Sequence, residues 1–200
     1  MEVPLLPLDS TIIYTVPVVL SRLRLLSITL FKDHYGTIHS GEAGFLVEPL
    51  ETTINVFIPV GEHAEKLSKL EGRYVEIEIN PPFFETSGPV NAEKPSIALE
   101  PPVPGVPAPH YRLVGVFKIF TPLWGVFECG NLRFPLTGDV NVENGKSVFH
   151  RGELRIDVPS WDEWPEKLEV VKSAWIEVRG VRFYGYLPEG SKRGETIWSP

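Results

Sequence analysis

The side chains whose types could support catalysis are few and scattered. Glu76 and Glu78 alternate along one predicted strand beside Arg73, which is the arrangement of a general acid–base pair. On an alternating strand, however, that face is usually the solvated one, so we interpret both carboxylates as surface groups. The glycines match no phosphate-binding loop, and no nucleophile elbow surrounds any serine. The sequence therefore predicts a protein that is not an enzyme.

Metal ligands are equally sparse. His34 and His39 lie in a predicted turn and strand, without a cysteine or a further histidine at zinc spacing. Cys129 is the only cysteine, which excludes a disulfide within the chain and fits a reducing compartment. We expect no metal site and no cofactor.

The charge of the chain bears on which kinds of partner it could bind. The 200 residues carry a formal net charge of −7, and residues 1–100, with 7 basic and 14 acidic side chains, account for all of it. A phosphate-binding surface on that half would work against its own field. All five Trp residues lie in the second half. One Met, no Gln and 20 Pro form the composition expected of a thermophile's protein.

We expect neither a membrane span nor a leader peptide. The apolar region over residues 12–30 contains Pro17, Arg22 and Arg24, so it cannot supply the run of about 20 uncharged residues that a span needs. The N-terminus has Glu2 and prolines where a signal peptide would have a basic region. These features predict a cytoplasmic protein.

Local patterns predict mostly strands. Alternating apolar residues favour strands over 18–31, 37–47, 53–60, 74–79, 96–99, 111–120, 126–136, 152–158, 174–179 and 181–187. A helix is expected over residues 61–70, where Ala64 and Leu67 form an apolar stripe and Gly72 supplies a stop. A second helix is expected to begin at Pro165, with Leu168 facing the sheet.

Two stretches of the chain resemble each other. Phe31, Gly36, Gly41 and Phe45 recur as Phe120, Gly125, Gly130 and Phe134, at a constant offset of 89 residues (120 − 31). Between the two copies, residues 100–109 contain five prolines, a composition that favours polyproline II and a semi-rigid spacer. The predicted division is an arm (1–17), a first barrel (18–100), the spacer (101–109), a second barrel (110–187) and a tail (188–200). The alternative is that the prolines form a long loop within one domain.

The order of elements in each half resembles the OB-fold, a five-stranded Greek-key barrel. The positions that carry the resemblance are the repeated glycines and phenylalanines and the helices near Leu67 and Leu168. The resemblance implies a mainly β fold of two similar five-stranded OB-like barrels, each with one short helix between strands 3 and 4. A pair of β-sandwich halves is the alternative.

OB-fold proteins commonly bind oligonucleotides on the face of strands 2 and 3, through stacking aromatics and cations. The resemblance therefore implies that the second barrel binds single-stranded DNA or RNA through Trp124, Phe127, Arg133, Phe134, His150, Arg151 and Arg155. The competing interpretation places the three aromatic side chains in the core, where large aromatics are usually buried.

A protein partner is the second expectation. Trp161 and Trp164 flank a turn and Trp198 stands alone near the C-terminus, and Trp is common at interface hot spots. Trp161 and Trp164 would otherwise cap the barrel. Two functions thus stay open, namely a single-strand-binding protein and a scaffold subunit that binds proteins through the acidic first barrel and the termini. The sequence pI near 5.3 favours the scaffold, and the fold resemblance favours nucleic acid.

Overall fold

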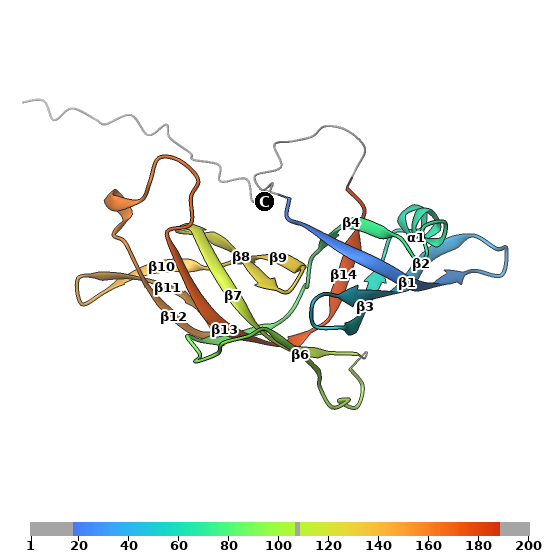
Figure 1. Cartoon of the computed structure of the whole chain (residues 1–200), viewed down its shortest axis with the longest axis horizontal. Helices are drawn as coiled ribbons and strands as arrows, with labels where there is room; N and C mark the ends of the chain where they lie inside the picture. The colour runs from blue at the N-terminus through green and yellow to red at the C-terminus, as the bar shows by residue number, and fades with distance from the viewer. Residues whose placement is uncertain (1–17, 107–108, 189–200) are drawn as a thin grey trace, which may run out of the picture.

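The computed structural model describes residues 18–106 and 109–188, which form two β-sheets that lie side by side (Figure 1). The first sheet contains β1 (Leu20–Lys32), β2 (Ile38–Val47), β3 (Thr52–Ile58), β4 (Tyr74–Ile79) and β14 (Phe183–Tyr186). The second contains β5 (Glu85–Gly88), β6 (Ser96–Leu99), β7 (Tyr111–Thr121), β8 (Trp124–Cys129), β9 (Leu132–Thr137), β10 (Asp139–Glu143), β11 (Lys146–Arg151), β12 (Glu153–Val158) and β13 (Lys172–Val181). The prediction of a mainly β protein is confirmed.

The first sheet closes into a barrel with the strand order β1-β2-β3-β14-β4, which returns to β1. Its last strand, β14, comes from the far end of the chain. β14 runs parallel to β3, with Phe183 opposite Val56, and antiparallel to β4, with Gly185 opposite Ile79. The closed barrel excludes a β-sandwich for this part of the chain.

Helix α1 (Gly61–Ser68) connects β3 to β4 and packs Ala64 and Leu67 into the barrel. On its solvent side, Glu62 pairs with Lys66 at 2.6 Å and Glu65 pairs with Lys69 at 3.2 Å. Such i,i+4 pairs stabilise a short helix. The predicted apolar stripe is confirmed, and the helix ends two residues earlier than the sequence indicated.

The second sheet is curled and open, and we call it the open sheet. Its strand order is β10-β11-β12-β5-β13-β7-β8-β9, and β6 pairs with β7 beside this path. Eight strands on the main path and an open edge make it unlike the barrel. The prediction of two similar five-stranded barrels is therefore wrong for the second half.

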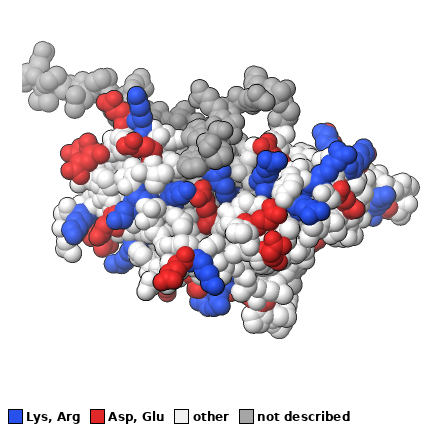
Figure 2. Space-filling view, in the orientation of Figure 1, with Lys and Arg blue, Asp and Glu red and all other residues white. Residues whose placement is uncertain are grey.

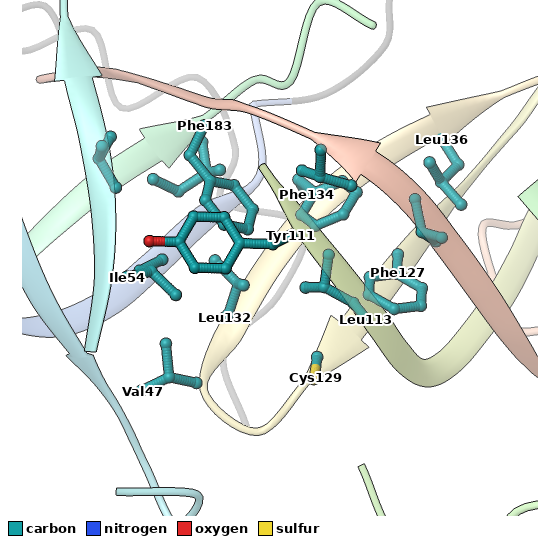
Figure 3. Packing of buried hydrophobic residues seen from close by; sticks show 14 of the residues in the cluster. Val47, Ile54, Tyr111, Leu113, Phe127, Cys129, Leu132, Phe134, Leu136 and Phe183 are labelled. Atoms are coloured by element: carbon teal, nitrogen blue, oxygen red, sulfur yellow. The ribbon is translucent and has the colours of Figure 1, made fainter. Parts of the chain in front are cut away.

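One hydrophobic core serves both sheets. Barrel residues such as Val47, Ile54 and Phe183 belong to the same buried cluster as Leu132 and Phe134 of the open sheet (Figure 3). A shared interior of this kind makes the two sheets one packing unit. The two sheets therefore do not correspond to two independent domains.

Hydrogen bonds add to this junction. The hydroxyl of Ser21 in β1 donates to the carbonyl oxygen of Arg133 in β9 and accepts the N–H of the same residue, both at 2.8 Å. Asn131, in the β8–β9 turn, donates to the carbonyl of Arg22 at 2.9 Å and accepts the N–H of Glu48 at 2.8 Å. These bonds satisfy backbone groups on both sides of the junction, Arg133 in the open sheet and Arg22 and Glu48 in the barrel.

The proline-rich segment is not a spacer between domains. β6 and β7, which flank it, pair antiparallel with Leu99 opposite Tyr111, and the N–H of Glu100 donates to the carbonyl of His110. The segment is therefore the loop of a hairpin within the open sheet, because sheet pairing brings its two ends together. The long-loop alternative describes it correctly.

The predicted division at this segment fails for the same reason. β6, expected as the fifth strand of the first barrel, lies in the open sheet, and β14, expected to close the second barrel, closes the first. The chain crosses between the sheets after β4 and returns after β13. The predicted arm (1–17) and most of the tail (189–200) lie outside the described residues.

Residues that correspond to each other in the sequence repeat do not all occupy equivalent positions in the two sheets. Gly41 lies within β2, where an added Cβ would meet the carbonyl oxygen of Thr29 at 2.9 Å. Its sequence counterpart, Gly130, forms the β8–β9 turn with φ +63. The expected strand over residues 126–136 is consequently two strands joined by a turn.

The second helix is absent. Residues 161–163 form a single 3-10 turn, and no helix follows over residues 164–171. Leu168, expected to face the sheet, is exposed. The N–H of Val171 donates to the carbonyl of Ile119 in β7, so the chain enters sheet pairing here and cannot also form helical bonds.

Candidate functional site

The three aromatic residues predicted to stack on bases are buried. Phe127 and Phe134 are fully inaccessible, with ring centroids 5.1 Å apart, and Trp124 is 4% exposed and stacks on Phe120. A base cannot reach a ring that is covered on both faces. The competing interpretation, which placed these residues in the core, is correct.

The predicted arginines do not form a basic groove. Arg133 pairs with Glu128 at 3.2 Å, and Arg155 pairs with Glu143 at 3.4 Å. Lys and Arg side chains are interspersed with Asp and Glu over the visible face of the molecule (Figure 2). A continuous positive stripe, which a duplex-binding surface needs, is not seen on that face.

Arg151 has a different environment. Its Nη1 donates to the carbonyl oxygen of Thr137 at 2.7 Å, and its guanidinium lies 4.1 Å from the ring centroid of Phe84. Burial lowers the pKa of Arg151. His150, opposite Asp139 in the β10–β11 ladder, lines a hollow together with Arg151 and Trp124. Three of the seven predicted residues thus meet at one place.

The predicted partner-binding tryptophans differ from one another. Trp161 is 49% exposed on the 3-10 turn, whereas Trp164 packs against the shared core. Trp198 lies outside the described residues. Of this set, Trp161 is exposed and Trp164 is partly buried within the described part of the chain.

The barrel carries an aromatic cluster that the sequence reading did not assign. Phe57 of β3 and Tyr184 of β14 are adjacent in register, and their ring centroids lie 5.3 Å apart at a T-shaped angle of 69°. The guanidinium of Arg182 lies 5.3 Å from the Phe57 centroid and 5.6 Å from the Tyr184 centroid. We call these three residues the barrel platform.

The platform faces outward because of strand alternation. In β3, Ile54, Val56 and Ile58 are fully buried, so Phe57 points to the other face. In β14, Phe183 is fully buried, so Tyr184 likewise points out. All three platform residues are partly exposed. Two rings and a cation therefore meet on the outer surface of the barrel.

A carboxylate borders the platform. Glu42 of β2 lies opposite Phe57, and burial raises the pKa of Glu42, although the nearby Arg182 acts to lower it. Partial desolvation disfavours the charged form of a carboxyl group. The platform thus combines apolar rings with one cation and one partly desolvated acid.

The β1–β2 loop leads into β2, the strand that carries Glu42. Asp33 organises it, since one carboxylate oxygen accepts the N–H groups of Tyr35 and Thr37, each at 2.9 Å, and the other contacts His39 at 3.0 Å. The His39 contact is the largest factor that lowers the pKa of Asp33. The result is a structured loop that holds Tyr35 83% exposed.

The sequence contained a usable signal for the platform. Arg182, Tyr184 and Tyr186 alternate with Val181, Phe183 and Gly185, which places polar-tipped residues on one strand face. Phe57 falls on the polar face of its strand. The pairing of β14 with β3 could not be predicted from the sequence, because all strands of the open sheet lie between these two strands along the chain.

Other classes of site find no support among the described residues. No group of three or more His, Cys, Asp or Glu side chains could hold a metal ion there. Within the same residues, no helix has the length and apolar character required to cross a bilayer. Cys129 is buried, and burial raises the pKa of its thiol to about 12.

Comparison with known proteins gave no match for the chain among family models, curated proteins or solved structures.

Proposed function

We propose that the protein is a non-catalytic binding protein that takes single-stranded nucleic acid on the outer face of its barrel. The observation that carries this proposal is the barrel platform, in which two outward rings and one guanidinium lie within stacking distance of each other. Base–aromatic stacking is tolerant of sequence and supplies about 1–3 kcal/mol per base.

The barrel topology supports the same proposal. Its order β1-β2-β3-β14-β4, with one helix between β3 and β4, is the arrangement of an OB-type barrel with β14 as the fifth strand. In OB-folds, the face of strands 2 and 3 and the adjoining loops take oligonucleotides. The platform lies beside that face, and the loop that presents Tyr35 leads into β2, the first of those two strands. The likeness to the OB-fold is part of the proposal.

Charge sets the kind of binding to be expected. The first hundred residues carry an excess of acidic side chains, and the platform holds one cation. A duplex, whose bases are stacked inside and whose outer surface is phosphate, would meet little attraction here. An unpaired strand offers its bases to the rings. We therefore expect binding dominated by stacking, with a shallow dependence on salt.

Fluorescence anisotropy of labelled oligo-dT and oligo-U tests the proposal. The substitutions Tyr184→Ala and Arg182→Gln should each weaken binding by roughly 5- to 100-fold, because each removes a stacking partner. Arg155→Gln, which changes an exposed arginine of the open sheet, is the matched control and should have no effect. The logarithm of the affinity should fall with the logarithm of salt by a slope of roughly 1–2.

Two results would overturn the proposal. One is the absence of binding by the unaltered protein at the highest soluble concentration. The other is an equal loss of affinity in the platform variants and in Arg155→Gln, which would mean that the strand contacts positive charge in general.

A further inference from the structure

A groove on the open sheet has features that the barrel platform does not explain. Two hollows, each of about 580 Å³, share Arg151 as a lining residue. The first is bordered by the β7–β8 turn and the start of β10, and the second by the β4–β5 crossover and the end of β13. We call them together the Arg151 groove, and its lining is Pro82, Phe83, Phe84, Glu85, Glu100, Leu123, Trp124, Thr137, Gly138, Asp139, His150, Arg151, Gly152, Arg179 and Gly180.

Arg151 is held in one orientation at the centre of the groove. Its Nη1 bonds to the carbonyl oxygen of Thr137 at 2.7 Å, and Phe84 lies under its guanidinium at 4.1 Å. Its own carbonyl accepts the hydroxyl of Thr86 at 2.8 Å. No acidic side chain of residues 18–106 or 109–188 forms an ion pair with it. A cation fixed in this way loses little entropy when it binds an anionic group.

Phe83 is the most unusual residue of the groove. Its side chain is 81% exposed, in a segment that follows Pro81 and Pro82. The fixed backbone of the prolines restricts where the ring can go. A large exposed ring beside a stacked Phe84–Arg151 pair has the composition of an interface hot spot, in which aromatic residues and Arg are enriched.

The charges of the groove discriminate between classes of ligand. Arg151, Arg179 and His150 share the lining with Glu85, Glu100 and Asp139. Arg179 is paired with Glu177 at 3.4 Å, and Glu100 accepts the N–H of Gly180 at 2.8 Å. Three carboxylates along the lining would repel a polyanion such as nucleic acid. A polypeptide can carry both acidic and basic side chains, so it can match a lining in which positive and negative groups are mixed.

We infer that the Arg151 groove is a docking site for an extended segment of a partner protein, which sets an apolar side chain against Phe83 and a carboxylate against Arg151. The inference develops the scaffold role that the sequence left open, and moves it from the acidic barrel and the termini to the open sheet. It does not depend on nucleic-acid binding, because no lining residue of the groove belongs to the barrel platform.

The test uses the full chain and a phage-displayed library of random 12-residue peptides. Selection on the unaltered protein should enrich peptides in which an aromatic or large aliphatic residue stands close to Asp or Glu. Synthetic peptides made from the enriched sequences should bind at least tenfold more weakly to Phe83→Ala and to Arg151→Gln. Replacing the acidic residue of the peptide by its amide should weaken binding to the unaltered protein and have little effect on Arg151→Gln.

Tyr35→Ala is the matched control, because Tyr35 is as exposed as Phe83, at 83% and 81%, but lies on the barrel loop. That variant should bind the peptides normally. Arg151→Lys separates charge from geometry and should recover only part of the loss, since Lys lacks the planar fork that pairs with a carboxylate. Thermal melts of each variant show whether the fold is kept.

Three outcomes would overturn the inference. They are a selection without any shared pattern, peptides that bind Phe83→Ala as well as the unaltered protein, and a loss of oligo-dT binding in Phe83→Ala. The last outcome would assign the groove to nucleic acid, and it is distinguishable from failure of the barrel platform because Tyr184→Ala leaves the groove intact.

Discussion

The hydroxyl oxygen of Tyr111, in the open sheet, accepts the backbone N–H of Asn55, in the barrel, at 2.9 Å. Asn55 lies just outside the short ladder between β3 and β14, whose pairs begin at Val56. Tyr111 therefore supplies the acceptor that β14 does not reach, and its ring packs on Phe183 at 5.3 Å (Figure 3). Closure of the barrel thus depends on a residue of the other sheet.

The substitution Tyr111→Phe should lower the free energy of unfolding by about 1 kcal/mol, because the Asn55 N–H would lose its acceptor in a partly buried hydrogen bond. Urea unfolding measures the change. Tyr74→Phe is the control, since the Tyr74 hydroxyl bonds to Glu48 on an exposed surface at 2.9 Å, and we expect a change within about 0.5 kcal/mol there. Equal effects of the two substitutions would contradict the role given to Tyr111.

The position of β14 gives a second prediction. A fragment of residues 18–80 contains four barrel strands and the helix, but leaves β3 and β4 without the strand between them. It should not unfold cooperatively, because unpaired strand edges and a missing Phe183 leave the core incomplete. The same fragment joined through a Gly-Ser linker to residues 182–188 should gain β-sheet circular dichroism and a cooperative melt.

A third fragment, residues 18–100, tests the domain division that the sequence suggested. If residues 18–100 fold as well as the linked form, then β14 is dispensable and the first half is a domain on its own. Amide hydrogen exchange of β3 and β4 in the two forms would show which strand edges are protected.

Local features of the fold could be predicted from the sequence, because they depend on neighbours in the chain. The bounds of β4 and β6 agree with the predicted strands, and α1 shows the predicted apolar stripe. Alternation and i,i+4 pairing are short-range signals. Partner choice among strands is not short-range, so nothing near residues 181–187 indicated that this strand would leave the open sheet for the barrel.

The site could be predicted only in part, for a physical reason visible in β8. Nearly every residue of this strand is buried, including Trp124 and Val126 on one face and Phe127 and Cys129 on the other. A strand covered on both faces has no polar face, so alternation could not show which rings were exposed. The exposure of Phe83 could not be predicted either, because this residue lies in the connection between β4 and β5, where no alternating pattern indicates which side chains face solvent.

The thiol of Cys129 should make stability depend on alkaline pH. Its pKa is raised by burial from the usual value of 9.0 to about 12. The folded chain keeps this proton where the unfolded chain releases it, so the stabilisation is complete below pH 9 and is lost as the pH rises from 9 towards 12. Urea unfolding between pH 8 and 10.5 should show a steeper decline for the unaltered protein than for Cys129→Ala.

The same burial predicts slow thiol chemistry. Ellman's reagent at pH 8 should react with Cys129 only as fast as the protein opens, and at once in urea, because the thiolate is the reactive form. Rapid reaction in the folded state would show that the thiol is accessible and would contradict the pH argument as well.

Glu78 should lower stability at neutral pH. Burial alone raises the pKa of this carboxyl group, which lies opposite Tyr186 on the outer face of the barrel. The folded chain therefore holds a proton at a pH where the unfolded chain has released it, and stability falls as the pH rises through the window above the usual pKa of 4.5. Glu78→Gln removes the buried charge, so it should be more stable than the unaltered protein at pH 7 and equal to it at pH 4.

Glu76→Gln, an exposed change on the same strand, is the matched control and should alter stability by no more than about 0.5 kcal/mol at either pH. A loss of stability in Glu78→Gln at pH 7 would mean that the charged carboxylate has a favourable partner, and would reverse the sign of this prediction.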